Sequence, residues 1–181
     1  MQRKSFEGMN CSIARALEEV GEWWSLMIVR ECTQGSTRFE EFQKELGIAR
    51  NILTVRLEKL TRLGILERFA LEERANAEGY RLTEKGEELY PVLVALMQWG
   101  DKWLYCGGKP SVELVEDATG EAIQPITVQS KGGRPLSYRE VRFSSAAGAT
   151  EKTDRVIKRR NGLVLKTAEL STPQRKTRHR E

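Results

Sequence analysis

Histidine and cysteine are scarce in this chain, which has one histidine, His179, and three widely spaced cysteines, Cys11, Cys32 and Cys106. A structural zinc site needs clustered ligands, and a disulfide framework needs regularly spaced cysteine pairs. The sequence also has no phosphate-binding glycine loop and no paired metal ligands, so it gives little support to an enzyme. We therefore expect no catalytic residues, no metal site and no cofactor, and only a thiol remains as a candidate for redox chemistry.

Long apolar runs are also missing. The longest, at 26–29 and 92–97, are far shorter than the roughly 20 residues that a membrane-spanning helix needs. The basic amino terminus is followed by no apolar core or cleavage site, so no secretory signal is readable. With 39% hydrophobic and 31% charged residues among 181, full-length disorder is excluded and one globular domain with appended pieces is predicted. We expect a cytoplasmic protein with no membrane partner.

The first part of the chain has no basic surplus. Residues 1–106 contain 15 Lys and Arg and 17 Asp and Glu, a net charge of −2, whereas residues 107–181 have a net charge of +6. All of that surplus falls after Gly148. The overall charge of +4 is therefore a property of the tail, and it does not by itself indicate nucleic-acid binding by the rest of the chain.

The spacing of apolar residues predicts four helices, at about 11–20, 23–32, 37–46 and 49–63. The second is apolar on nearly every side, which is typical of a central buried helix. Thr37 and Glu40 have the spacing of a capping box at the start of the third helix. Only a tight turn at Gly47 separates the third helix from the fourth. Two helices so joined form a helix-turn-helix.

Two short strands at 65–72 and 79–83 then predict a hairpin. Thr83 caps a long helix in which Pro91, lacking an N–H, is expected to introduce a bend. This helix has an apolar stripe wider than a monomer of this size needs: Leu89, Val92, Leu93, Leu96, Trp99 and Trp103. The order of elements predicts an α+β fold, a winged helix-turn-helix with a long C-terminal dimerisation helix. A small β appendage follows it.

We divide the chain into a winged helix-turn-helix and dimerisation domain at 9–106, a β-hairpin appendage at 107–147 and a basic, flexible tail at 148–181. β-like runs at 112–115, 123–128 and 138–143 underlie the appendage. Within the tail, residues 155–166 fit a hairpin about Asn161-Gly162 and fit disorder equally well. From Ser171 onward we expect no fixed structure.

The fourth predicted helix has a polar side that carries Arg50, Asn51, Thr54, Glu58 and Thr61. Arginine and asparagine suit guanine and adenine edges in the major groove, and threonine suits the thymine methyl group. The amino-terminal part of a recognition helix is the part that enters the groove. An ordinary solvated helix face explains the pattern about equally well.

Other arginines are weaker candidates for DNA contacts. Arg56 lies nearer the apolar side of its helix, which favours an internal ion pair or a phosphate contact over base reading. In the hairpin, Arg74 and Arg81 are surrounded by glutamates at positions 72, 73 and 78. We therefore expect a weak contribution from the wing.

The sequence resembles the HxlR family of bacterial winged helix-turn-helix regulators. The resemblance is carried, in order, by Cys11, 16–17, 21–24, 38–42, 53–57, Leu60, Gly64, 80–86, 91–93 and 99–100. It implies a homodimer that binds a roughly palindromic operator in double-stranded DNA and regulates transcription. The DNA-contacting candidates are then Arg38, Arg50, Asn51, Thr54, Val55, Arg56, Arg74 and Arg81, and the interface candidates are Leu93, Leu96, Trp99 and Trp103.

Two departures from the family are visible. The wing tip at 74–78 lacks the usual proline, which puts minor-groove contact in doubt. Some members carry a cysteine-containing knuckle in the appendage, but residues 117–120 and 130–133 here contain no cysteine. Without thiolates no tetrahedral zinc site of that kind forms.

Cys11 is the candidate for sensing an oxidant or small-molecule effector. A thiol in the first turn of a helix lies where free N–H groups and the helix dipole favour the thiolate. Some regulators that this chain resembles sense quinones or oxidants through a cysteine at this place. The alternative is a structural thiol packed at the start of the helix.

The acidic wing and the net charge of 1–106 leave a second function open. A winged-helix module used for protein-protein contacts, without specific DNA readout, is the alternative to a sequence-specific DNA-binding regulator.

Overall fold

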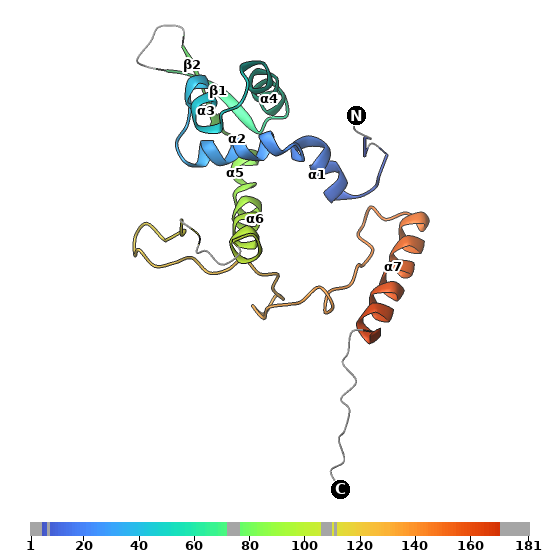
Figure 1. The fold of residues 1–181 in the computed structure, drawn as a ribbon. Coiled ribbons are helices and arrows are strands. Elements are labelled where there is room, and N and C mark those ends of the chain that lie inside the picture. Colours follow the sequence, from blue (N-terminus) through green and yellow to red (C-terminus); the bar gives the residue numbers. More distant parts are fainter. Residues whose placement is uncertain (1–4, 7, 72–76, 106–109, 111, 171–181) are drawn as a thin grey trace. The chain divides into compact units, whose positions relative to one another are not determined.

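The computed structural model describes residues 5–6, 8–71, 77–105, 110 and 112–170 (Figure 1). The chain divides into two compact units, 1–126 and 127–181, and each is described by itself. Across the described residues, no helix combines the length and apolar character needed to cross a membrane.

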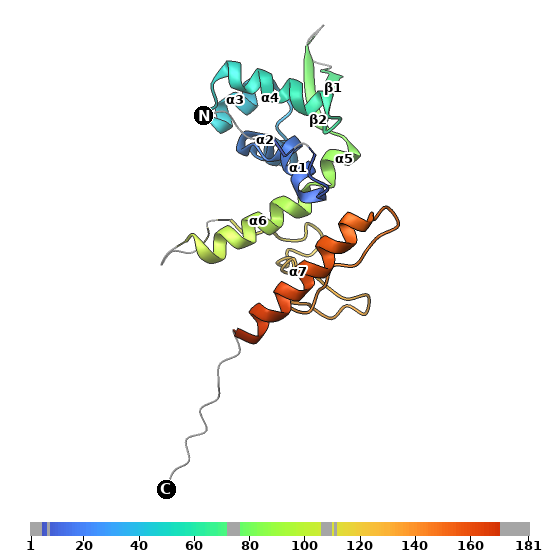
Figure 2. The same ribbon diagram turned by 90° about the vertical axis from the view of Figure 1, so that its right-hand side faces the viewer.

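The first unit is a winged helix, as the sequence predicts. Its elements are α1 (Ser12–Val20), α2 (Trp23–Thr33), α3 (Phe39–Leu46), α4 (Arg50–Arg62), β1 (Leu66–Ala70), β2 (Glu78–Leu82), α5 (Glu84–Glu87) and α6 (Tyr90–Trp103). Both views show α3 and α4 on one side of α2, while α5 and α6 lead away from the other side (Figures 1 and 2). Helix α2 is therefore the central element around which the others pack.

The core forms where α2, α3, α4 and the start of β1 meet. Its fully or almost fully buried side chains are Ile28, Val29, Phe42, Leu53, Leu57, Leu60, Ile65 and Leu66. Burial of each such side chain contributes about 1.5–3 kcal/mol. The expectation that α2 is buried on nearly every side fails at its first residue, because Trp23 is 76% exposed.

The cap of α3 differs by one residue from the expected one. The helix begins after Arg38, and the Glu41 carboxylate accepts hydrogen bonds from the backbone N–H groups of Arg38 (2.9 Å) and Thr37 (2.8 Å). The Thr37–Glu40 capping box was therefore wrong in register. The chain enters the helix one residue later, so Glu41 is the third residue of the helix.

Strands β1 and β2 pair antiparallel, with Leu66 opposite Leu82 and Arg68 opposite Tyr80. Thr83 then caps α5, accepting a hydrogen bond from Gly86 N–H at 3.2 Å. The long bent helix expected from Thr83 onward is in fact two helices. Pro91 lies in the first turn of α6, where its missing N–H costs no hydrogen bond, so it starts a helix and does not bend one.

After α6, the secondary structure differs from the predicted one more than it does within the winged helix. In place of the expected β runs, the described residues contain two isolated bridges, Val115 with Ala122 in the first unit and Gln129 with Pro135 in the second. Residues 155–166 lie within a helix, α7 (Glu151–Leu170), so the hairpin about Asn161-Gly162 was wrong. The division of the chain at 107 and 148 stays a prediction. Residues 171–181 lie outside the described part.

Candidate nucleic-acid interface

The candidate interface is built on the turn between α3 and α4. Gly47 ends α3 with φ +60°, a left-handed conformation that glycine adopts at little cost. Ile48 is buried in the core and Ala49 precedes the first residue of α4. This short connection fixes the start of α4 against the end of α3.

Helix α4 has one buried side and one open side. Leu53, Leu57 and Leu60 are fully buried, whereas Asn51, Thr54 and Val55 are exposed. The Thr54 hydroxyl donates to the carbonyl oxygen of Arg50 at 2.9 Å. Its donor is thus used within the helix, so the exposed side chain has a methyl group and acceptor capacity left for other contacts.

Arg50 is held at the first residue of α4 by an aromatic ring. Its guanidinium lies over the ring of Phe39 from α3, 4.7 Å from the ring centroid. A cation over an aromatic face is attracted by about 0.5–1 kcal/mol at an exposed site. The contact restricts the rotamers of Arg50 without burying its charge.

Arg38 lies at the start of α3, near the same end of the helix pair, and is half-buried. The pKa of Glu41 beside it is lowered, chiefly by the hydrogen bonds from the backbone N–H groups of Arg38 and Thr37. Glu41 is therefore an ionised cap that fixes the position of Arg38.

Arg56 is turned to the interior of the domain. Its Nη2 lies 2.9 Å from Oε2 of Glu22, the residue before α2, and its side chain is 20% exposed. This is the internal ion pair that the sequence offered as one of two readings. The pair connects α4 to the start of α2 and takes Arg56 away from the open side of α4.

The described arginines of the wing are paired within the sheet. Arg81 donates to Glu67 at 2.6 Å and lies over the ring of Phe69, while Arg68 pairs with Glu78 at 3.2 Å. Arg74 lies outside the described residues. The described strands therefore present paired rather than free charges.

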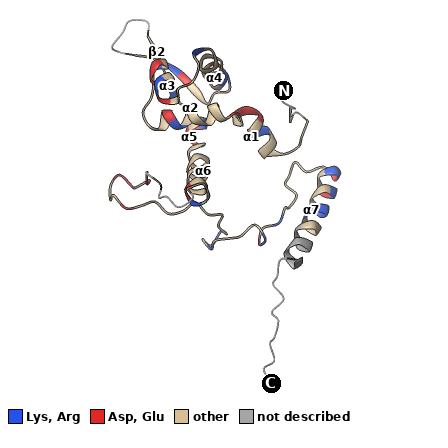
Figure 3. Cartoon of the chain, viewed as in Figure 1, with Lys and Arg blue, Asp and Glu red and all other residues tan. Residues whose placement is uncertain are grey.

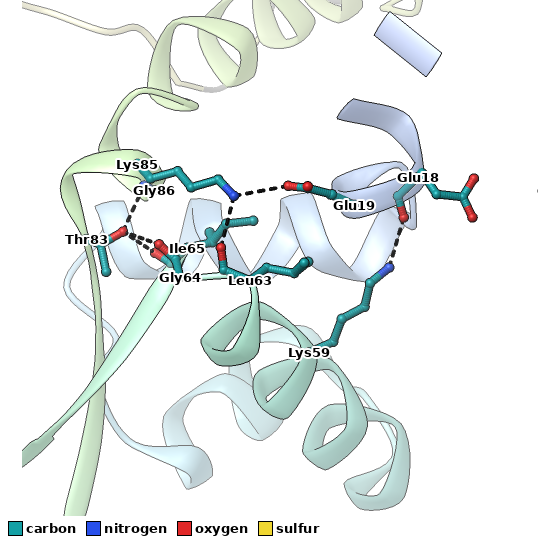
Figure 4. A network of polar contacts seen from close by, with 9 residues as sticks. All are labelled: Glu18, Glu19, Lys59, Leu63, Gly64, Ile65, Thr83, Lys85 and Gly86. Atoms are coloured by element: carbon teal, nitrogen blue, oxygen red, sulfur yellow. Dashed lines mark hydrogen bonds and ion pairs between the residues drawn. The ribbon is translucent and has the colours of Figure 1, made fainter. Parts of the chain in front are cut away.

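A polar network that the sequence did not reveal fixes α1 to the rest of the domain (Figure 4). Lys85 of α5 donates to Glu19 (3.1 Å) and to the Leu63 carbonyl (2.9 Å), and Lys59 of α4 donates to the Glu18 carbonyl (3.1 Å). These partners are 22 to 66 residues apart in the sequence, so no local pattern could have indicated them. The carboxyl end of α1 is thus joined directly to the end of α4 and the base of the wing.

The four interface candidates divide into two groups. Leu96, Trp99 and Trp103 are exposed along α6, at 51%, 56% and 61%, whereas Leu93 is half-buried against the core. Ile13 and Leu17 of α1 are exposed too. Figure 3 shows α6 almost free of charged residues. The described part of the chain therefore leaves apolar surface on both helices.

The described cysteines have different environments. Cys11 is the half-buried N-cap residue of α1, and its side chain makes no capping hydrogen bond. Burial, reinforced by the charge of Glu31, raises the pKa of the Cys32 thiol to about 12. Cys106 lies outside the described residues. Cys32 is therefore a poor nucleophile at neutral pH.

Comparison with known proteins agrees with this architecture. Residues 19–107 match the family model described as HxlR-like helix-turn-helix. The chain is 39% identical over 136 residues to the uncharacterized HTH-type transcriptional regulator MT3179 of Mycobacterium tuberculosis. The aligned stretch covers 75% of this chain and 85% of that protein. It is 32% identical over 99 residues to YdeP of Bacillus subtilis, another HTH-type transcriptional regulator, covering 54% of this chain and 76% of that one.

Two solved structures of candidate transcription factors are also similar. PA1607 has a TM-score of 0.74 and 38% identity, covering 79% of this chain and all of that one. PA1374 from Pseudomonas aeruginosa has a TM-score of 0.57 and 38% identity, covering 80% of this chain and 99% of that one. In both cases the matched part of this chain is longer than the family match, so the similarity extends beyond residues 19–107. This chain belongs to the HxlR-like helix-turn-helix family of transcriptional regulators.

Proposed function

We propose that the protein regulates transcription by binding a specific double-stranded operator through the amino-terminal half of α4. The observation that carries this proposal is the exposed group of Asn51, Thr54 and Val55 beside Arg50, which Phe39 holds in place. These side chains supply an amide, a hydroxyl, methyl groups and a guanidinium on one open helix surface. That combination matches the hydrogen-bonding and methyl pattern of the major groove.

The other candidates receive different roles. Arg38, at the start of α3, contacts a phosphate and sets the register of α4 on the duplex. Arg56 supports α4 through Glu22 and reads no base. The wing contributes little, because Arg68 and Arg81 are already paired with glutamates.

The active species in this proposal is a homodimer. Its interface consists of the exposed side chains of α6, Leu96, Trp99 and Trp103, with Ile13 and Leu17 of α1 at the margin. A monomer rarely leaves such a contiguous apolar surface in water. Two copies related by a twofold axis place two α4 helices on a palindromic operator, one helical turn apart.

Selection of bound sequences from random duplexes tests this function directly. A palindrome is the expected product, and the Asn51→Ala variant is expected to lose about 1–3 kcal/mol of specific affinity. Arg50→Ala is expected to lose a similar amount, about 1–3 kcal/mol. Arg62→Ala is its control, since it removes the same charge from the far end of the same helix. Recovery of no preferred sequence would instead favour a module for protein-protein contacts.

Regulation through Cys11 is the second part of the proposal. The support is its place at the N-cap of α1, where the first N–H groups of the helix have no side-chain cap, together with the unreactive character of Cys32. An oxidant or electrophile that modifies Cys11 displaces α1. Because Lys59 and Lys85 join α1 to α4 and α5, this displacement reaches the DNA-binding elements.

A further inference from the structure

The second unit contains a helix whose charge is arranged on one side. On α7, at about 100° per residue, Lys152, Arg155, Lys158 and Arg159 fall within one third of the helix circumference. All four are exposed. We call these four residues the cationic stripe; Figure 3 shows the basic residues of this helix in blue.

The other side of α7 faces its own chain. Thr153, Asp154, Val156, Ile157 and Asn161 are half-buried. Asn161 accepts from the Phe143 N–H (3.1 Å) and donates to the Phe143 carbonyl oxygen (2.9 Å), and Asp154 accepts from the Ser145 hydroxyl. Contacts to residues 143–145 thus fix which side of the helix is covered, and the cationic stripe is the side left open.

Glu151 falls within the same arc as the cationic stripe, so this side of α7 carries four cations and one carboxylate. Among the described residues, no hydrogen bond or ion pair engages these four side chains, whereas the described wing arginines Arg68 and Arg81 are both paired. The domain that carries α4 has a net charge of −2 over residues 1–106. This domain therefore has no net surplus of cations, so cations on α7 would add to the phosphate contact assigned to Arg38.

The geometry points to α7 as an accessory phosphate-binding helix, which contacts the backbone of the duplex DNA that α4 binds. This inference rests on the proposed function. Because the two units are one chain, binding by α4 raises the local DNA concentration around α7. Point charges on flexible side chains contact phosphates without reading bases, so α7 adds affinity and leaves sequence preference unchanged.

A membrane surface is the other partner that a basic amphipathic helix fits. Such a helix inserts a free apolar side among the lipids. Here Ile157 is half-buried and shares its side with Asp154 and Asn161, which are bonded to residues 143–145, and Val156 is half-buried as well. The covered side therefore favours DNA over lipid.

The test compares two charge-matched triple variants of the full chain. The stripe variant carries Arg155→Gln, Lys158→Gln and Arg159→Gln. The control variant carries Lys131→Gln, Arg139→Gln and Arg142→Gln, exposed residues of the same unit that lie outside α7. Glutamine keeps helix propensity near that of lysine and arginine, and circular dichroism checks that α7 persists.

The readout is the dependence of the binding constant on salt, measured with the selected operator and with an unrelated duplex. The slope of log K against log salt should become shallower by about 2–3 in the stripe variant, for both duplexes alike, and change much less in the control. The ratio of operator to unrelated affinity should stay the same. Equal slopes for the two variants, or a changed ratio, would overturn the inference.

Two further outcomes distinguish a failure of the proposed function from a failure of the inference about α7. If the wild-type chain binds no duplex at all, the proposed function fails together with the role of α7. If wild type and stripe variant share one salt slope but only wild type binds vesicles of equal parts phosphatidylcholine and phosphatidylserine, the partner is a membrane and only the inference about α7 fails.

Discussion

The guanidinium of Arg50 lies over the ring of Phe39, 4.7 Å from its centroid, and this contact joins the first residue of each of the two helices in the helix-turn-helix. Phe39 is half-buried and Arg50 is exposed, so the ring is a fixed support for a side chain that points into solvent. An arginine restricted in this way loses less conformational entropy when it binds a base or phosphate.

Phe39→Leu is therefore expected to weaken operator binding without removing any group that contacts DNA. The loss should be smaller than that of Arg50→Ala, on the order of 1 kcal/mol or less. Binding assays on both single variants and the double variant give the coupling energy. Strict additivity of the two losses would show that the ring does not position Arg50.

Replacing Leu96 with Glu should convert the dimer to monomers. The substitution puts a charge at the centre of the exposed apolar surface of α6, where dimerisation would have to bury it unpaired. Sedimentation at micromolar concentration measures the result. Val128→Glu, at an exposed position of the second unit, is the control and should leave the dimer intact. A wild-type chain that sediments as a monomer contradicts the proposed interface.

Oxidant or electrophile should lower the operator affinity of wild type but not of Cys11→Ser. Cys11 occupies the N-cap position of α1, and the far end of this helix is bonded to Lys59 and Lys85. A modified thiol therefore disturbs the helix that these lysines hold. Operator affinity before and after treatment is the measurement, with mass spectrometry to locate the adduct. Identical responses of the two proteins would leave Cys11 a structural thiol.

The pKa of Cys32 predicts a loss of stability at alkaline pH. Burial and the charge of Glu31 raise the pKa of Cys32 in the folded state to about 12, above the ordinary thiol pKa of 9.0, so the folded protein keeps a proton that the unfolded chain releases. The contribution is fully present below pH 9.0 and declines as pH rises from there toward 12. The slope should reach about 1.4 kcal/mol per pH unit. Denaturant unfolding across this range should show the decline in wild type and a weaker one in Cys32→Ala.

Two glycine substitutions should have opposite effects on stability. At Gly86 an added Cβ would lie 2.3 Å from the carbonyl oxygen of Ile65, and Gly86→Ala is expected to cost about 1–3 kcal/mol. At Gly162, within α7, an added Cβ would have no side chain or other segment within 4 Å. Gly162→Ala should therefore stabilise the helix by about 0.5–1 kcal/mol. Thermal unfolding and helical circular dichroism distinguish the two. A loss of helicity in Gly162→Ala would contradict the assignment of α7.

Local patterns in the sequence were sufficient to predict the winged helix, because each of its elements is encoded by neighbouring residues. Apolar residues at helical spacing specify α2 to α4, a glycine ends α3, and Thr83 caps the helix after the wing. The open side of α4 was equally readable, since Leu53, Leu57 and Leu60 fix which side is buried. These features need only the periodicity of a helix and the chemistry of its ends.

The partner of each charged side chain, in contrast, became clear from the folded chain alone. Arg56 meets Glu22 across 34 residues and Lys85 meets Glu19 across 66, and sequence spacing carries no information about such pairs. A contact between residues distant in the sequence also accounts for the helix α7 where a hairpin was predicted. Asn161-Gly162 favours a turn locally, but Asn161 bonds both backbone groups of Phe143, 18 residues earlier, and this contact supports a helix that leaves its cations exposed.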